Sequence, residues 1–308
     1  MRLLTGVCLG LGIFSLAACD EFDIGGFSDR YREDFHFSYP LNAGGSLQID
    51  NANGSVEIVG WDKNTIEIDG TKYAGSEDRL KEIKIDVVPS PGSVSIRTIP
   101  PVPRMGNFGA RYVIHVPRKV ELQNIVSSNG AIRVETIEGH TRLKTSNGGI
   151  RAFALVGTLD ARTSNGSIDL SDVTGDTSVH TSNGGIKADV KKGNFEASTT
   201  NGSITARLLE TDSRPVRLES SNGHIDLTMD AAREVHADTS NSSIVVRMPS
   251  SAGATVRAHT SNAPITTDFD VSVHGGLLSK HRLEGNIGSG GPLLDLGTSN
   301  GSIKILRM

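Results

Sequence analysis

Residues 145–168 read TSNGGIRAFALVGTLDARTSNGSI, one full period of a repeat and the start of the next. Each period opens on an Asn that follows Ser or Thr, usually precedes Gly, and stands three residues before an Ile. An earlier copy at Asn53-Gly54 has Val56 in the Ile position. A fixed period predicts an array of stacked supersecondary units. The nine asparagines of the array are Asn129, Asn147, Asn165, Asn183, Asn201, Asn222, Asn241, Asn262 and Asn300, at intervals of 18, 18, 18, 18, 21, 19, 21 and 38 residues.

One period contains two short strands and two tight corners. Ile150 and Ala152 alternate with polar Arg151, and a second alternating segment, 159–163, follows Gly157. This alternation is typical of strands with one buried face. Such strands bury little alone, but stacked periods pair each strand with its equivalents above and below. The sequence therefore predicts an all-β fold, a parallel β-helix or β-solenoid with rungs of 18–21 residues. The expected inward columns begin Ile132, Ile150, Ile168, Ile186 in one strand and Leu143, Ala161, Val179, Ala197 in the other.

The recurring asparagines are predicted to form a structural ladder. Asn tolerates the left-handed backbone region, and its amide both donates and accepts hydrogen bonds. When corners stack in register, each amide can donate to one neighbour and accept from the other, in a column that we expect to be buried in the turn. The alternative is a column that binds sugar or metal. An amide bonded to both neighbours has little capacity left for a ligand, so we favour the ladder.

The N-terminus predicts export and lipid anchoring. Arg2 is followed by an apolar run, 3–16, that is too short to span a membrane. The segment Leu16-Ala17-Ala18-Cys19 resembles the bacterial lipobox, which implies cleavage before Cys19 and attachment of a diacylglycerol to its thiol. The alternative is a plain anchor or secretory signal with a chance Cys. Cys8 lies in the segment to be removed, so no disulfide is expected.

These patterns divide the chain into four segments, with one helix and one C-terminal excursion among them. The helix expected at 77–82 is opened by Ser76 as N-cap. A Gly-rich excursion at 268–296 is expected to cover the C-terminal end of the array, because an open sheet edge pairs readily with other chains. The expected order is a lipoprotein signal peptide at 1–18, a flexible tether at 19–34, a strand-rich first portion with one short helix at 35–126, and the repeat solenoid at 127–308.

Composition limits the function classes. The net charge is -4 over 308 residues without a basic block, so nucleic acid is not an expected partner. The chain has no phosphate-binding loop, no zinc spacing of Cys and His, and no nucleophile elbow. We therefore expect no cofactor, no metal and no catalytic residue, and the predicted protein is not an enzyme.

Two groups of residues would suit other functions, glycoside hydrolysis and metal binding. Asp160 and Glu196 are predicted two rungs, or about 10 Å, apart, a separation that would suit an inverting glycosidase. However, the short corners provide no walls for a sugar groove. His236, Asp238 and His259 are predicted on adjacent rungs and resemble a metal-binding set, but a flat sheet does not make ligands converge.

Several motifs together resemble the bacterial putative-adhesin family, whose β-helical domain has no assigned function. The resemblance covers nearly all of the mature chain, and it implies a parallel β-helix on an exported or membrane-tethered protein without established catalytic residues. The matching motifs are Asn53-Gly54-Ser55-Val56, Gly60-Trp61-Asp62, Val116-Pro117, the Thr-Ser-Asn-Gly corners, and the closing Thr298-Ser299-Asn300-Gly301-Ser302-Ile303.

The sequence favours a non-catalytic, lipid-anchored module of the cell envelope that contacts partners through flat polar faces. Its expected location is a bacterial membrane, with the chain facing the periplasm or the cell surface. Its expected partners are the membrane, through the lipid, and an envelope protein or polysaccharide. The alternatives are a polysaccharide lyase or hydrolase, and a partner protein in envelope-stress or other signalling.

Overall fold

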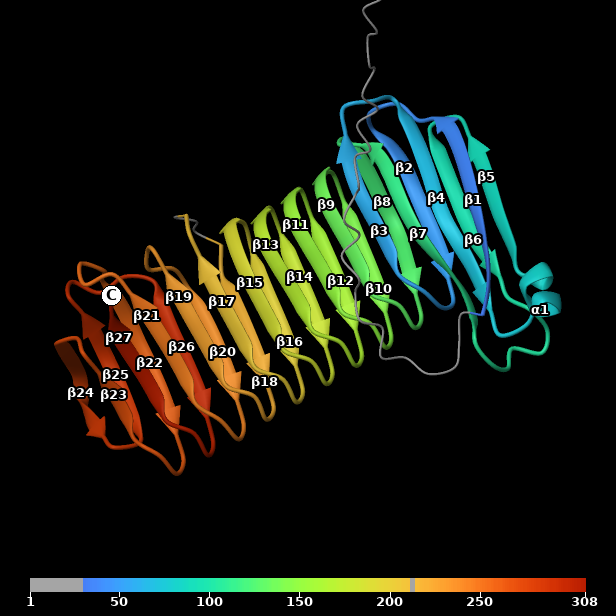
Figure 1. The fold of residues 1–308 in the computed structure, drawn as a ribbon. Coiled ribbons are helices and arrows are strands. Elements are labelled where there is room, and N and C mark those ends of the chain that lie inside the picture. The colour runs from blue at the N-terminus through green and yellow to red at the C-terminus, as the bar shows by residue number, and fades with distance from the viewer. Residues whose placement is uncertain (1–29, 211–213) are drawn as a thin grey trace, which may run out of the picture.

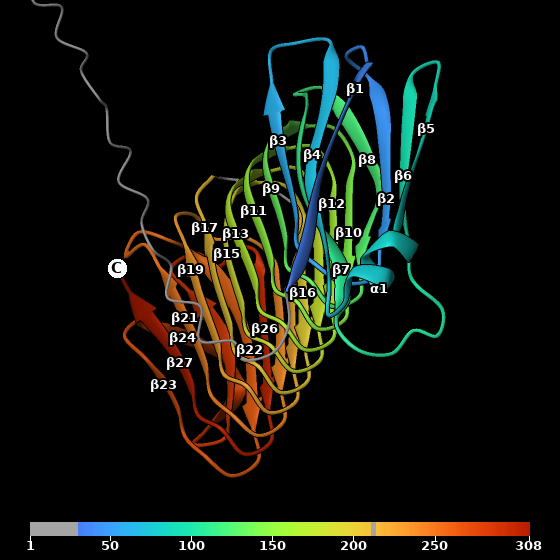
Figure 2. The same ribbon diagram turned by 45° about the vertical axis from the view of Figure 1, so that its right-hand side comes forward.

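The computed structural model describes residues 30–210 and 214–308. Two long sheets face each other and form the walls of a coil (Figures 1 and 2). The predicted all-β solenoid is confirmed. Sheet A contains β1 (Tyr31–Pro40), β3 (Val56–Trp61), β4 (Thr65–Ala74), β7 (Phe108–Pro117), β9 (Ile132–Glu138), β11 (Ile150–Val156), β13 (Ile168–Thr174), β15 (Ile186–Lys192), β17 (Ile204–Leu208), β19 (Ile225–Met229), β21 (Ile244–Met248), β23 (Ile265–Thr267) and β27 (Ile303–Arg307). Sheet B contains β2 (Gly45–Asn51), β5 (Lys84–Ser90), β6 (Ser93–Ile99), β8 (Val120–Ser127), β10 (Thr141–Thr145), β12 (Leu159–Thr163), β14 (Thr177–Thr181), β16 (Phe195–Thr199), β18 (Val216–Ser220), β20 (Val235–Thr239), β22 (Ala254–Thr260), β24 (Val271–Ser279), β25 (Arg282–Ile287) and β26 (Leu293–Thr298).

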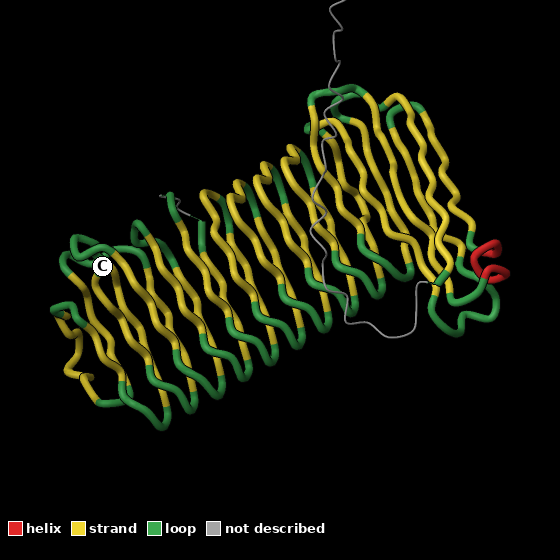
Figure 3. The backbone as a smooth tube through the Cα atoms, viewed as in Figure 1, coloured by secondary structure: helices red, strands yellow, loops and turns green. Residues whose placement is uncertain are grey.

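Each rung of the array runs through one strand of sheet B, an Asn corner, one strand of sheet A and a second corner. The corners line up along the coil in Figure 3. Equivalent strands pair in parallel, so that Ile150 lies between Ile132 and Ile168, and Ala161 lies between Leu143 and Val179. These side chains are almost fully buried. The predicted inward columns therefore form the core.

The second corner uses a positive φ angle. Gly157 and Gly175 have φ values of 132° and 130°, a backbone region that residues with a Cβ rarely adopt. Gly139 and Gly193, at the equivalent positions of the neighbouring rungs, also have positive φ angles, of 151° and 128°. The glycines that stand ten residues after their asparagines therefore mark the turn from sheet A back to sheet B.

The asparagines form a continuous ladder of side-chain hydrogen bonds. Asn165 Nδ2 donates to Asn147 Oδ1 over 2.8 Å, and Asn147 Nδ2 donates to Asn129 Oδ1 over 2.6 Å. The ladder lies on the surface, because the corner turns these side chains outward. The expected burial of this column is therefore wrong. In space the order is Asn53, Asn129, Asn147, Asn165, Asn183, Asn201, Asn222, Asn241, Asn300 and Asn262.

A buried hydroxyl column lies two residues before the asparagines. Thr163 Oγ1 donates to the carbonyl of Gly148 in the preceding rung over 2.8 Å. This side chain points into the corner, where water does not reach the carbonyl. The column satisfies backbone acceptors that the tight corner leaves without a backbone partner. Its members are Ser127, Thr145, Thr163, Thr181, Thr199, Ser220, Thr239, Thr298 and Thr260.

The order of rungs departs from the order of the sequence at the C-terminal end. After β23 the chain forms the antiparallel hairpin β24–β25 and then returns. Strand β26 enters between β20 and β22, and β27 enters between β21 and β23. The 38-residue interval before Asn300 therefore does not represent two rungs added in succession. The last rung in sequence is the second to last in space.

The hairpin covers the final corner of the array. The backbone N–H of Thr260 donates to the carbonyl of His281 over 2.9 Å, and that of Ile265 donates to the carbonyl of Lys280 over 3.0 Å. These two N–H groups would otherwise have faced an open end. The hairpin belongs to the excursion that the sequence predicted at 268–296 and lies at this end of the molecule, as Figure 1 shows, whereas residues 293–296 of that segment begin β26, which lies inside the array.

The N-terminal part is permuted in the same way. The rung β2–β3 lies between β6–β7 and β8–β9, so Asn53 directly accepts a hydrogen bond from Asn129 over 2.6 Å. The predicted helix is present as α1 (Glu77–Glu82), and Ser76 Oγ accepts from the backbone N–H of Arg79. No helix of the described residues is long and apolar enough to cross a membrane.

Strand β1 begins inside the segment that the sequence assigned to the tether. It pairs antiparallel with β4 from Tyr31 onward, whereas the tether was expected to reach residue 34. Polar residues open this strand, and their pairing with β4 outweighs their weak strand propensity. The signal peptide, Cys19 and the rest of the expected tether lie outside the described residues.

We predict that Thr163→Val destabilises the protein more than Asn165→Ala does. The first change leaves the buried Gly148 carbonyl without a donor, which costs about 1–2 kcal/mol. The second removes side-chain hydrogen bonds at a surface where water can replace them, which costs about 0.5 kcal/mol. Thermal unfolding of both variants measures the difference. A lower midpoint for Asn165→Ala than for Thr163→Val would contradict this assignment.

Candidate interaction surface

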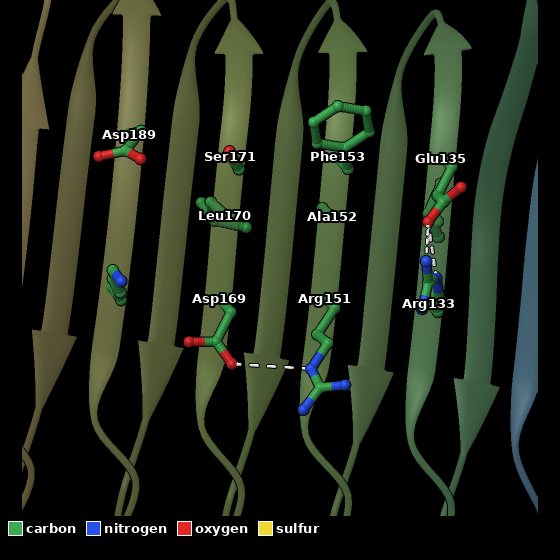
Figure 4. A pocket seen from close by; sticks show the side chains of 11 residues that line it. Arg133, Glu135, Arg151, Ala152, Phe153, Asp169, Leu170, Ser171 and Asp189 are labelled. Carbon is green, nitrogen blue, oxygen red and sulfur yellow. Dashed lines mark hydrogen bonds and ion pairs between the residues drawn. The ribbon is translucent and has the colours of Figure 1, made fainter.

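The outer face of sheet A presents two columns of side chains where β9, β11, β13 and β15 lie side by side (Figure 4). Parallel pairing aligns them, because equivalent residues occupy equivalent positions on every rung. The first column is Arg133, Arg151, Asp169 and Lys187, and the second is Glu135, Phe153, Ser171 and Asp189.

A stacked backbone feature borders the second column. Thr136, Ala154 and Asp172 have φ angles of 58°, 53° and 57°, a left-handed conformation that is uncommon outside Gly. Ala154 and Asp172 are skipped in the pairing, which resumes at Leu155 and Val173. Each of these strands therefore has one left-handed residue at the same place, and the parallel register continues across it. Non-Gly residues held in this conformation cluster at ligand-binding and other functional sites.

Phe153 is the exception in its column. Three aromatic residues lie in 127–308. Phe195 and Phe269 are buried, whereas Phe153 is 50% exposed on the outer face. Sequence reasoning missed this residue. The available signal was an aromatic side chain in an outward position that neighbouring rungs fill with Glu135 and Ser171.

Charged groups surround the exposed ring. Arg133 Nε lies 2.7 Å from Glu135 Oε1, and Arg151 Nε lies 3.9 Å from Asp169 Oδ2. These residues line a hollow of about 590 Å3 around Phe153. The hollow thus combines an apolar ring with guanidinium and carboxylate groups that solvent can reach.

This hollow is one of three that share lining residues. Arg133 and Arg151 also line the next hollow toward the N-terminal end. That second hollow in turn shares Ser55 and Glu57 with a third, which reaches strand β1. We name the three together the sheet A groove. It runs across neighbouring strands from β15 to β1, along the axis of the coil.

The carboxylates considered for glycoside chemistry lie on sheet B. Asp160 and Glu196 are two rungs apart with Ser178 between them, as predicted. The Asp160 carboxylate contacts Arg162 Nε at 2.8 Å and Arg142 Nε at 3.6 Å. Two guanidinium groups therefore hold it in an ion-pair network on the face of the sheet.

The residues considered for metal binding are separated by the inserted rung. Asp295 lies between His236 and Arg257, and Gly297 lies between Asp238 and His259. The expectation that the three candidates lie on adjacent rungs is wrong, because β26 enters between β20 and β22. His236 instead contacts carboxylates, with Nε2 2.9 Å from Glu234. Within residues 30–210 and 214–308, no group of three or more His, Cys, Asp and Glu side chains is placed to hold a metal.

Asp238 has the most distinctive environment of this set. Its carboxylate and the His259 ring lean over Gly297, where a Cβ would lie 2.2 Å from Asp238 Oδ1 and 2.7 Å from His259 Cε1. Partial burial of the Asp238 carboxyl raises its pKa, and the charge of Asp295 adds to the effect, whereas His259 opposes it.

Comparison with known proteins identifies the fold. No model of a protein family matches the sequence, and no curated protein matches it. Among solved structures, a putative adhesin from Parabacteroides merdae has a TM-score of 0.50 at 10% identity, over 89% of this chain and 96% of that one. A putative adhesin from Parabacteroides distasonis has a TM-score of 0.45 at 13% identity, over 90% and 97% of the two chains. A putative lipid binding protein from the same organism has 0.44 at 11%, over 89% and 96%. The resemblance to proteins named putative adhesins is confirmed at the level of the fold.

We predict that Asp238→Asn raises the thermal midpoint at pH 7. The pKa of Asp238 is higher in the folded protein than the ordinary value of 3.8, so its carboxylate destabilises the folded state above that folded pKa. The penalty decreases as the pH falls through the folded pKa and is absent below the ordinary value. Melting curves at pH 7 and pH 3.5 should therefore show a positive difference that shrinks on acidification. A variant that is less stable at pH 7 would contradict this.

Proposed function

We propose that this protein is a non-catalytic, lipid-anchored interaction module of the cell envelope, and that the sheet A groove binds an extended polysaccharide. The observation that carries the proposal is the continuity of the groove over successive rungs, with Phe153 exposed in it. A ligand with its own repeat, laid along the coil axis, would meet a regularly spaced row of protein groups.

The chemistry of the groove suits a sugar chain. An exposed aromatic ring offers an apolar face, against which the C–H face of a sugar ring can pack. Arg133, Glu135 and Arg151 border this ring and offer hydrogen-bond donors and acceptors for hydroxyl groups. An apolar surface with a few placed polar groups is the usual composition of a binding site.

The location follows from the N-terminal segment. The lipobox resemblance at Cys19 implies a lipid anchor in a bacterial membrane, and Cys19 precedes the first residue of β1, Tyr31, by twelve residues. A segment of twelve residues can span at most about 40 Å, which limits the distance between β1 and the membrane. The name of the similar solved structure from Parabacteroides merdae, a putative adhesin, supports a place in the envelope or on the surface.

We expect Phe153→Ala to weaken polysaccharide binding by about tenfold, the effect of losing roughly 1.4 kcal/mol of contact. Val156→Ala is the matched control, because Val156 belongs to the same strand, is 52% exposed and does not line the groove. Binding of both variants to an array of bacterial envelope polysaccharides is the measurement. Equal binding by the two variants, or capture of an envelope protein that is insensitive to Phe153→Ala, would contradict the assigned ligand.

We expect Cys19→Ser to abolish lipid attachment. Cells fed a labelled fatty acid should incorporate it into the wild-type chain and into Cys8→Ser, which changes the cysteine of the removed segment. The Cys19→Ser chain should remain unlabelled and keep residues 1–18. Label in the Cys19→Ser chain, or absence of label in the wild type, would contradict the anchor.

A further inference from the structure

The two ends of sheet A are finished differently. At the C-terminal end the edge of sheet A is β23, only three residues long. Phe269 is buried there beneath the Arg307 guanidinium, which lies 5.0 Å from the ring centre. At the N-terminal end the edge of sheet A is β1, ten residues long. Short or covered edges resist association, whereas a long uncovered edge is a template for another strand.

The inward side of β1 carries a row of aromatic side chains. Phe35 and Phe37 have ring centres 5.9 Å apart, and Phe37 and Tyr39 stack at 6.5 Å. Phe35 also meets Tyr112 of β7 edge-on at 5.5 Å. All three β1 aromatics pack against the main core but are only partly buried. The core thus continues to the last strand of the sheet and remains partly open there.

The outward side of β1 carries a carboxylate and an imidazole, one on each side of Phe35 in the sequence. Asp34 Oδ1 accepts a hydrogen bond from Thr71 over 2.7 Å, and His36 Nδ1 lies 2.8 Å from Asp69 Oδ1. The His36 side chain is 58% exposed. Asp34 Oδ2 and His36 Nε2 are the atoms that remain for a further partner.

We propose that two copies of the chain pair through their β1 strands, antiparallel about a two-fold axis at Phe35, so that the two A sheets join end to end. In this register Phe35 faces Phe35 of the second copy, and Asp34 faces His36 of the second copy. Two-fold symmetry repeats each contact, which gives two carboxylate–imidazole pairs beside one aromatic pair.

Hydrogen-bond complementarity of the outward side chains selects this register over its neighbours. Residues directly opposite each other in an antiparallel pair lie on the same face of the sheet. A register that placed odd-numbered residues opposite even-numbered ones would therefore put the aromatic side chains of one copy on the same face as Asp34 and His36 of the other. Moving the axis by one residue to Asp34 opposes two carboxylates, and moving it to His36 opposes two imidazoles. The axis at Phe35 is the one among these three that places each Asp34 carboxylate opposite an imidazole, which can donate a hydrogen bond to it.

Strand β5, the neighbouring edge of sheet B, is less suited to such pairing. Pro89 lies within it and has no N–H to donate. Ile85 and Val87 of this strand are partly buried against the same core. A membrane surface would cover the apolar residues but would leave the N–H and C=O groups of β1 unpaired. A second copy satisfies both the backbone edge and the aromatic row.

Cysteine cross-linking of the full chain in its membrane tests the proposal. One tagged copy carries Asp34→Cys and a differently tagged copy carries His36→Cys, two positions expected about 4.5–5.5 Å apart between Cα atoms, within the range of a disulfide. The matched control pairs Ser38→Cys with His36→Cys, which are four residues out of register, or about 13 Å apart. All three side chains are exposed, so the substitutions leave the core intact.

We expect oxidation to link most of the Asp34→Cys chains to His36→Cys chains and to leave the control pair unlinked. Native mass spectrometry of the detergent-extracted wild type should show a dimer, and Asp34→Lys should weaken dimerisation at least tenfold. A wild-type monomer, equal linking in both pairs, or linking of Asp34→Cys to a different protein would overturn the proposal. None of these readouts depends on polysaccharide binding, so the two proposals can fail separately.

Discussion

The tightest constraint in this molecule is the approach of one Asn corner to the next. A Cβ added to Gly166 would lie only 2.0 Å from the carbonyl oxygen of Gly148, a distance that no real contact allows. The same carbonyl accepts the buried hydroxyl of Thr163. Because backbone contacts and a buried hydrogen bond meet at one atom, the corners have a single way to stack. The parallel pairing of both sheets follows from that register.

Register in turn determines what the outer faces can do. Every outward side chain faces its equivalents in the neighbouring rungs, so charges such as Arg142 and Asp160 neutralise each other across rungs. A surface of this kind is uniform unless a rung departs from the pattern. Phe153 is such a departure, and the sheet A groove gains its apolar contact from it. The proposed function therefore depends on an exception within a regular array.

The sequence predicts the repeating part of the fold well, because each rung repeats the same local signals of turn residues and alternation. It predicts the inward columns for the same reason, and helix α1 from its N-cap residue Ser76. It does not predict the position of Asn300 between Asn241 and Asn262, because a spatial insertion leaves no trace in local spacing. The sequence predicts that the Asn column is buried, whereas the Thr column two residues earlier is the buried one. Both residue types can form a polar ladder, so their spacing does not show which of the two columns points inward. Phe153 has no repeated signal to mark it, because the same position in the neighbouring rungs is filled by Glu135 and Ser171.

The order of rungs at the C-terminal end tests the account most directly. Spin labels at Ser164 and Ser299, and in a second sample at Ser164 and Ser261, occupy equivalent exposed positions of the Asn corners. The ladder order places Ser299 five rungs and Ser261 six rungs from Ser164, or about 24 and 29 Å at the usual strand spacing. Pulsed electron–electron distance measurement should therefore find Ser299 nearer than Ser261. The opposite order, or distances unrelated to multiples of the strand spacing, would contradict the stacked corners and the inserted strand.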